Sequence, residues 1–208
     1  TSFNLLLTSF GAYALSRKGF PCKRILLVLI VFTMYFNGGM IPRYLLINNT
    51  MKLGNNLLAL ILPQAISTYN FIVMRTSFLS VPDSLEESAK IDGANDFVIL
   101  FKIVLPVSMS VVAVMILFYG VAHWNAWFDA MIFLRDRQKY PLQLILREIL
   151  ILNSTETMTV DMSDHNNVAI GESIKYATIM VATLPVLVVY PFLQKYFVKG
   201  VMIGAVKG

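Results

Sequence analysis

Few side chains in this sequence are spaced for covalent chemistry. His123 and His165 lie far apart in the chain and lack the carboxylate or cysteine pattern of a metal site. The one cysteine, Cys22, cannot form an internal disulfide. The phosphate-binding pattern G-x-x-x-x-G-K-[ST] does not occur, so ATP would have to bind to another chain. The sequence therefore predicts no catalytic residue, no metal site and no cofactor on this chain.

The segment 81–106 has a residue pattern suited to binding a partner. Ser84, with Glu87 three residues later, makes a capping box that begins a helix. Gly93 can adopt the left-handed conformation that ends this helix, and a second helix is expected from about Asn95. A short amphipathic helix pair of this kind lies on lipid headgroups or docks into a partner's groove. Residue spacing alone does not choose between the two.

The composition indicates that this segment belongs to a membrane protein. Of the 208 residues, 57% are hydrophobic and 14% are charged, whereas average soluble domains carry roughly 25% charged residues. A water-soluble fold would lack polar side chains to cover its surface. Long charge-free stretches occupy residues 1–16, 25–42, 53–74, 103–128 and 176–194. Because a helix needs about 20 mostly apolar residues to cross a bilayer, the sequence predicts an all-α, polytopic transmembrane helical bundle.

Five membrane spans are expected. Their approximate ranges are 1–15, 25–42, 56–76, 106–128 and 174–197. The first begins at Thr1 inside an apolar stretch and is expected to be truncated. Pro63, Pro185 and Pro191 lie within spans, which indicates a packed bundle or a polar pathway, because the freed carbonyls need partners.

The basic residues in the connections predict an orientation. The net charge of +5 comes from lysines and arginines near span ends, which favours membrane orientation over nucleic-acid binding. The side with more of them holds Arg17, Lys18, Lys23, Arg24, Arg75, Lys90, Lys102, Lys195, Lys199 and Lys207. The tight cluster at 17–24 predicts that this side, with the connection 75–105 and the C-terminal tail, faces the cytoplasm.

The stretch Glu87-Ser88-Ala89, followed by Gly93 and by Ile103-x-Leu105-Pro106, resembles the "EAA" loop of ABC importer permeases (E-A-A-x3-G-x9-I-x-L-P). It departs from that pattern at Ser88, where the family usually has alanine. The resemblance implies a cytoplasmic coupling loop at 81–106, within a permease domain 1–197, that seats in an ATPase subunit. The residues that it implies in coupling are Glu86, Glu87, Ser88, Ala89, Asp92, Gly93, Ala94 and Pro106.

Other stretches extend the resemblance over the whole chain. Residues 12–17 and 199–208 are similar to parts of the carbohydrate branch, relatives of the maltose importer's smaller permease. Residues 36–42 and 124–127 resemble its subgroup for oligosaccharides and plant or algal polysaccharide fragments. Such permeases have six spans, so the first is expected to be missing. The resemblance implies a multi-pass permease subunit of an ATP-driven oligosaccharide importer, in the bacterial cytoplasmic (inner) membrane.

The resemblance also implies partners. They are a second homologous permease that completes the translocation path, two cytoplasmic ATPase subunits that carry ATP and Mg²⁺, an extracellular or periplasmic solute-binding protein, the sugar and the lipid bilayer, without nucleic acid. The C-terminal tail, 198–208, is expected to contact the ATPase pair. The tail residues implied in this contact are Lys199, Gly200, Gly204 and Lys207.

Sugars are bound by aromatic faces flanked by hydrogen-bonding groups, so polar and aromatic residues inside the spans are the substrate-path candidates. They are Tyr69, Asn70, Tyr119, Trp124 and Asn125. Asn70 is the first choice, because an unpaired amide is costly in hydrocarbon and should face the bundle interior. The alternative for each is a contact between helices or a place in an interfacial aromatic belt.

Two other classes of membrane protein are alternatives: an ion-coupled secondary transporter and an integral membrane enzyme. Proton coupling and membrane catalysis normally use Asp, Glu or His within spans or at a membrane face. The charge-free stretches hold no acidic residue, and the EAA-like loop has no role in either class. The sequence therefore favours a transport subunit, not an enzyme, with ATP hydrolysis on a partner chain.

Overall fold

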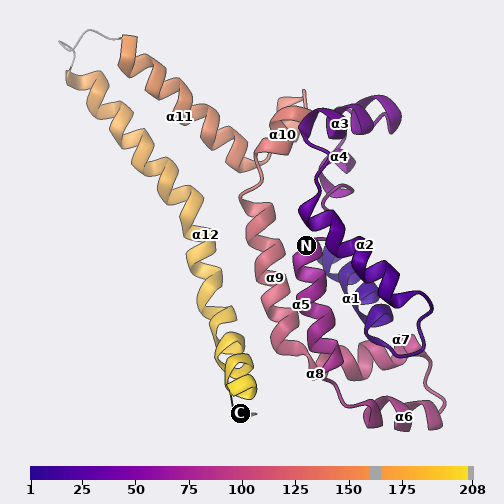
Figure 1. The fold of residues 1–208 in the computed structure, drawn as a ribbon. Coiled ribbons are helices and arrows are strands. Elements are labelled where there is room, and N and C mark those ends of the chain that lie inside the picture. The colour runs from indigo at the N-terminus through magenta and orange to yellow at the C-terminus, as the bar shows by residue number, and fades with distance from the viewer. Residues whose placement is uncertain (160–164, 206–208) are drawn as a thin grey trace. The chain divides into compact units, whose positions relative to one another are not determined.

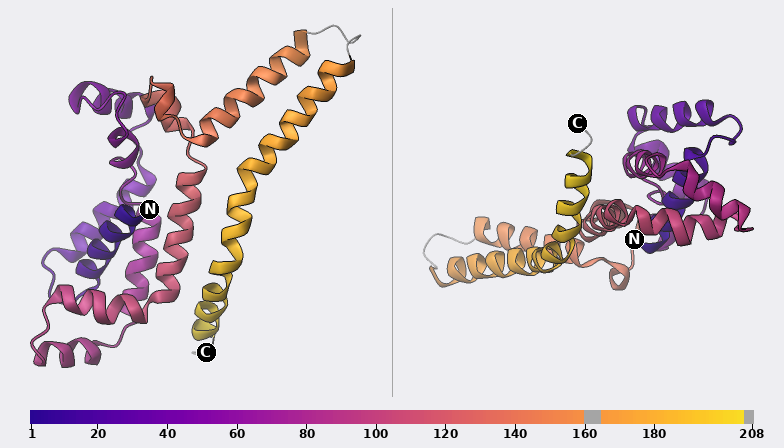
Figure 2. Two further views of the ribbon diagram at one scale, coloured as in Figure 1. Left: turned by 180° about the vertical axis from the view of Figure 1, so that it is seen from behind. Right: turned by 90° about the horizontal axis from the view of Figure 1, so that it is seen from below.

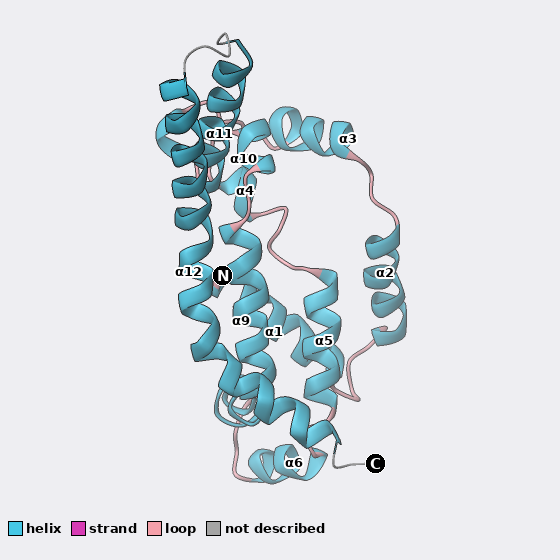
Figure 3. Cartoon of the chain, turned by 90° about the vertical axis from the view of Figure 1, so that its left-hand side faces the viewer, coloured by secondary structure: helices cyan, strands magenta, loops and turns pink. Residues whose placement is uncertain are grey.

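The computed structural model describes residues 1–159 and 165–205. These residues form helices joined by loops, with no strand among them (Figures 1 and 3). The predicted all-α class is confirmed for this part of the chain. The chain divides into two compact units, which we describe separately. Unit 1 comprises residues 1–43, 61–120 and the part of the last helix from Leu193, and unit 2 comprises residues 44–60 and 121–192.

Unit 1 is built around two helices that lie side by side, α1 (Ser2–Ser16) and α5 (Thr68–Leu79) (Figure 1). Its other elements are α2 (Lys23–Tyr35), α6 (Asp83–Ile91), α7 (Asp96–Ile99), the π-helical turn η2 (Leu100–Val104), α8 (Leu105–Val107) and α9 (Met109–Trp124) as far as Gly120. The centre of unit 1 is apolar, with Met74, Phe78 and Met115 fully buried. Burial of these large side chains holds α1, α5 and α9 together.

The polar groups buried in unit 1 are paired across helices. The Thr8 and Tyr119 hydroxyls lie 2.7 Å apart, and the Tyr119 oxygen also accepts from the backbone N–H of Ser67 at 3.1 Å. The Asn4 amide donates to the backbone oxygen of Gln64 at 2.6 Å. A buried polar group without a partner is costly, so these bonds fix α1 against α9 and against the segment before α5.

Cationic side chains close the C-terminal end of α1. Arg75 on α5 donates to the Leu15 carbonyl at 2.9 Å. Lys23 donates to the carbonyls of Ser16 and Arg17, each at 3.1 Å. The last carbonyls of a helix have no partner within the helix and carry partial negative charge. Positive side chains from α5 and the start of α2 therefore satisfy the end of α1.

Unit 2 contains the remaining elements. They are the π-helical turn η1 (Leu46–Thr50), α4 (Leu58–Ile61), α10 (Phe128–Phe133), the 3-10 turn η3 (Arg137–Lys139), α11 (Leu142–Thr159) and α12 (His165–Ala205) up to residue 192; α3 (Met40–Leu45) joins the two units. The helices α11 and α12 run side by side (Figure 2). Asn55, which has a positive φ of 59°, accepts from the backbone N–H groups of Arg135 and Asp136 at 3.1 Å. Its side chain thus ties the two parts of unit 2 together.

Three of the expected spans are not continuous helices. The range 25–42 breaks at 36–39, where Gly39 has φ +85° and donates to Asn37 Oδ1 at 3.0 Å. The range 56–76 breaks between α4 and α5, where Pro63 lacks an N–H. The range 106–128 breaks at Ser108. These ranges therefore include turns as well as helix, because freedom from charge reports hydropathy and not local backbone conformation.

Only one helical segment among the described residues, Gly171–Phe192 in α12, is long and apolar enough to cross a membrane by itself. Two bent helix pairs pass the same test when each is taken as one span: Lys23–Tyr35 with Met40–Thr50, and Asp96–Val107 with Met109–Trp124. The second pair is bent by 88°. The expected number of spans therefore stays a prediction.

The close approach of α1 and α5 at Gly11 gives a testable consequence. A Cβ at Gly11 would lie 3.0 Å from Cε2 of the buried Phe71 ring, whereas a Cβ at Gly120 on α9 would meet nothing within 4 Å. Crowding a packed core costs about 1–3 kcal/mol, against a helix-propensity gain of about 1 kcal/mol from Gly to Ala. We expect Gly11→Ala to lower the melting temperature of the purified complex and Gly120→Ala to leave it equal or higher. Equal melting temperatures for both variants would contradict this packing.

Candidate functional site

The helix α6 presents two different faces. Glu86 and Ala89 are its buried residues. Glu87 and Ser88 are exposed, and Ile91 is 86% exposed, which is unusual for a large apolar side chain on a charged helix. The outer face is therefore free, within this chain, to receive a partner. The coupling residues expected from the sequence divide between the faces, with Glu86 and Ala89 inside and Glu87 and Ser88 outside.

Gly93 ends α6 in the conformation that the sequence predicts. Its φ is +79°, in the left-handed region that glycine adopts at no steric cost. The N–H of Gly93 donates to the Lys90 carbonyl at 3.0 Å, and the N–H of Ala94 donates to the Ala89 carbonyl at 2.9 Å. These two bonds form a Schellman motif, which satisfies the last carbonyls of the helix. The expectation of two helices that meet near Gly93 is confirmed.

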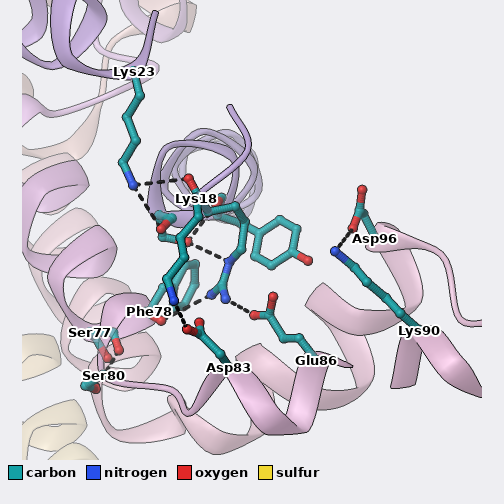
Figure 4. Close-up of polar contacts among 12 residues, drawn as sticks. Lys18, Lys23, Ser77, Phe78, Ser80, Asp83, Glu86, Lys90 and Asp96 are labelled. Atoms are coloured by element: carbon teal, nitrogen blue, oxygen red, sulfur yellow. Dashed lines mark hydrogen bonds and ion pairs between the residues drawn. The ribbon is translucent and has the colours of Figure 1, made fainter. Parts of the chain in front are cut away.

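The second helix starts directly after this turn. The side chain of Asn95 caps α7 by accepting from the N–H of Val98 at 2.9 Å. Lys90 on α6 and Asp96 on α7 form an ion pair at 3.7 Å across the turn (Figure 4). From α7 the chain continues through η2 to α8, which holds Pro106, and then bends by 88° into α9.

One local expectation for α6 is wrong. The helix begins at Asp83, with Pro82 at its N-cap and no side-chain capping bond. Ser84 and Glu87 therefore lie inside the helix and do not form the expected capping box. Proline fixes φ near the helical value, and Asp83 places negative charge in the first turn. These two residues start the helix in place of the capping box.

Arg17, just after α1, connects three elements at this site. Its guanidinium pairs with the Glu86 carboxylate of α6 and donates to the Phe78 carbonyl of α5 at 3.2 Å. It also lies over the ring of Tyr13, 4.8 Å from the centroid. From the sequence, Arg17 was interpreted as a charge that orients the chain and as part of the 12–17 resemblance, without a partner. No local pattern could have paired it with a carboxylate so distant in the sequence.

A second ion pair lies beside the first one but in solvent. Lys18 and Asp83 contact one another with both side chains exposed (Figure 4). The hydrogen bond from Lys18 holds the pKa of Asp83 below its usual value, and the same bond raises the pKa of Lys18. The pair's stabilisation is therefore lost as pH falls through the lowered Asp83 pKa, or rises through the raised Lys18 pKa. Solvent screens this pair, so it contributes little.

The substrate-path candidates do not share one compact unit. Tyr69, Asn70 and Tyr119 belong to unit 1, and Trp124 and Asn125 belong to unit 2. Asn70 and Tyr119 are buried, whereas Tyr69 is 54% exposed.

In unit 2, the indole of Trp124 donates to the Ala182 carbonyl at 2.9 Å. The sequence did not single out Arg147, whose guanidinium lies 3.3 Å from the centroid of the Trp127 ring. The expected tail contacts at Lys199, Gly200, Gly204 and Lys207 lie outside the residues whose surroundings the structure describes. Among the residues that it does describe, no group of three or more His, Cys, Asp or Glu side chains could hold a metal ion.

Comparison with known proteins gives consistent matches. The family described as "Binding-protein-dependent transport system inner membrane component" matches residues 8–203. The polygalacturonan/rhamnogalacturonan transport system permease protein YtcP of Bacillus subtilis is 47% identical over 210 residues, covering 100% of this chain and 72% of the relative. Protein LplC of the same organism is 44% identical over 208 residues, covering 100% of this chain and 70% of the relative.

A solved structure is also similar. It is the crystal structure of a bacterial ABC transporter involved in the import of the acidic polysaccharide alginate. One of its chains matches with a TM-score of 0.82 and 34% sequence identity, over 95% of this chain and 70% of that one.

The two faces of α6 predict different reactivity. In a Cys22→Ser background, a cysteine at the exposed position of Ile91 should react rapidly with a maleimide, and one at the buried position of Ala89 should react slowly until the protein is denatured. The measurement is the labelling rate in membranes stripped of peripheral subunits. Similar rates at both positions would show that α6 is not docked as described.

Proposed function

Because this chain belongs to the family of binding-protein-dependent transport system inner membrane components, we propose that its two-faced helix α6 is the coupling helix of an ATP-driven oligosaccharide importer. The chain is a membrane-embedded permease subunit of such an importer, a transport subunit and not an enzyme. It works with a partner permease, an ATPase and a solute-binding protein. The finer proposals are a multi-pass chain, one partner permease and two ATPase subunits that carry ATP and Mg²⁺.

The single observation that carries the coupling role is the geometry of α6. Its outer face exposes Glu87, Ser88 and Ile91, a mixture of charge and apolar surface suited to a protein groove. The Schellman turn at Gly93 joins it to α7, and the exposed Lys90–Asp96 pair spans the same turn. A displacement of α6 by an ATPase would therefore be passed through α8 and the bend at Ser108 to α9. Motion of this kind is alternating access by rigid-body rocking.

The proposed substrate is an oligosaccharide that carries carboxylates. One relative is named for polygalacturonan and rhamnogalacturonan, and one similar structure for the acidic polysaccharide alginate. The test is the ATPase activity of the complex in proteoliposomes, with its solute-binding protein, on addition of oligogalacturonate or of a neutral malto-oligosaccharide. Stimulation by oligogalacturonate alone supports the acidic class. Stimulation by the neutral sugar alone would overturn it.

The Gly93 turn provides a matched pair of variants for the coupling role. A β-branched residue at φ +79° pays roughly 1–2 kcal/mol of strain, whereas asparagine tolerates this conformation. We expect Gly93→Val to lower sugar uptake per ATP hydrolysed by a factor of about 5–30, with the complex still assembled. Gly93→Asn should keep most of the wild-type ratio. Wild-type coupling in Gly93→Val would argue against α6 as the coupling helix.

The C-terminal tail is proposed to hold the ATPase subunits in register, through Lys199, Gly200, Gly204 and Lys207. Glycines permit close backbone approach at an entropic cost that a free end would not recover. Deleting the last eight residues should weaken retention of the ATPase subunits or uncouple hydrolysis from uptake. The measurement is subunit stoichiometry after purification, together with coupled ATPase activity. An intact, fully coupled truncated complex would show that the tail is only a terminus.

A further inference from the structure

The structure assigns to the buried Arg17–Glu86 pair the role of holding α6 in a fixed orientation against α1 and α5, so that force applied to α6 reaches these helices. We propose that both are positioning residues for coupling. This proposal rests on the proposed function of α6. It goes beyond that function because it gives Glu86 a partner inside the permease and places a transmission contact on a residue outside the coupling loop.

Apart from the exposed Lys18–Asp83 pair, little else attaches α6 to the neighbouring helices of unit 1. The buried residues of α6 are Glu86 and Ala89. Ala89 contributes one methyl group to the apolar core, and a contact of that kind is non-directional. The Schellman turn and the Lys90–Asp96 pair connect α6 only to the chain that follows it. A directional contact on this buried face is needed to fix the rotation of the helix, and Glu86 supplies it.

The geometry around Arg17 also supports this role. The planar guanidinium has several donors in a fixed fork, and here it uses them on different elements. It pairs with Glu86 on α6 and donates to Phe78 O on α5 at 3.2 Å, while its Nε donates to Ser16 Oγ, at the end of α1, at 3.0 Å. Because one rigid group contacts all three helices, they cannot shift relative to one another without breaking one of its bonds.

The burial of the Arg17–Glu86 pair distinguishes it from the neighbouring Lys18–Asp83 pair. The side chains of Arg17 and Glu86 are 18% and 8% exposed, against 87% and 51% for Lys18 and Asp83. A buried charge that loses its partner is strongly unfavourable, so a buried pair resists separation, whereas an exposed pair opens readily into water. Only the buried pair can carry force. The exposed pair, one residue away from Arg17, is therefore a matched control.

The burial of Glu86 also separates its role from that of Glu87. Glu86 is buried and pairs with Arg17, whereas Glu87 is exposed, so a partner seated on the outer face meets Glu87 and not Glu86. The two adjacent glutamates thus differ in exposure, with Glu86 on the buried face of α6 and Glu87 on its exposed face. A substitution of Glu86 should act on transmission, and its effect should depend on Arg17.

The experiment is a double-mutant cycle in the complete complex, reconstituted in liposomes. The variants are Arg17→Gln, Glu86→Gln and both together. Arg17→Lys tests whether the branched guanidinium is needed, and Lys18→Gln is the control. The readouts are sugar transported per ATP hydrolysed, ATPase subunits retained and melting temperature. The double variant leaves no buried charge unpaired, so it tests the role even if a single variant fails to fold.

We expect the double variant, and each single variant that assembles, to lower the transport-to-hydrolysis ratio. The loss should be at least about fivefold, which is the smallest change that typical coupling free energies produce. The double variant should lose no more than the singles, because the two residues act as one unit. Arg17→Lys should recover only part of the ratio, and the Lys18→Gln control should match the wild type.

A wild-type transport-to-hydrolysis ratio in the double variant would overturn the proposal, and so would additive losses from the two single variants. Failure of the double variant to assemble would also overturn it, because the pair would then be purely structural. The Gly93 variants separate this failure from failure of the proposed function. If Gly93→Val uncouples transport and the double variant does not, only the Arg17–Glu86 role is wrong. If neither uncouples transport, α6 is not the coupling helix.

Discussion

The last carbonyls of α1, and the charge of Arg17 that follows them, need hydrogen-bond or ionic partners. The surrounding helices provide these partners. Arg75 comes from α5 and Lys23 from α2, and both donate to these carbonyls. Arg17 then pairs with Glu86 on α6. Unsatisfied backbone and charged groups are costly wherever water is excluded. One helix end thus fixes the positions of three other helices in unit 1.

This arrangement lets α6 serve two purposes with only nine residues. Its inner face is attached by a directional ion pair and a small apolar contact, and its outer face leaves Glu87, Ser88 and Ile91 exposed. A permease must receive motion from an ATPase and pass it on without deforming. The helix α6 ends in a Schellman turn, and a buried ion pair holds its inner face. It therefore meets that requirement better than a flexible loop would.

The features predicted correctly from the sequence are those that depend on neighbouring residues. The φ of Gly93 and the start of the second helix near Asn95 arise within a few residues of chain, so the local sequence was sufficient to predict them. The start of α6 was misread, because proline followed by aspartate initiates the helix ahead of Ser84. The break at Ser108 was not predicted, because apolar composition does not report backbone conformation. The Arg17–Glu86 and Thr8–Tyr119 contacts could not be predicted, since each joins residues brought together only by tertiary packing.

The central claim is that α6 moves as one rigid body with α1 during transport. Spin labels on cysteines at the exposed positions of Ser2 on α1 and Ser84 on α6, in a Cys22→Ser background, report this directly by double electron–electron resonance in the complete complex. The account predicts the same narrow distance distribution in the nucleotide-free and ATP-bound states. A shift or broadening of that distribution on ATP binding would mean that α6 moves independently of α1, which would contradict the account.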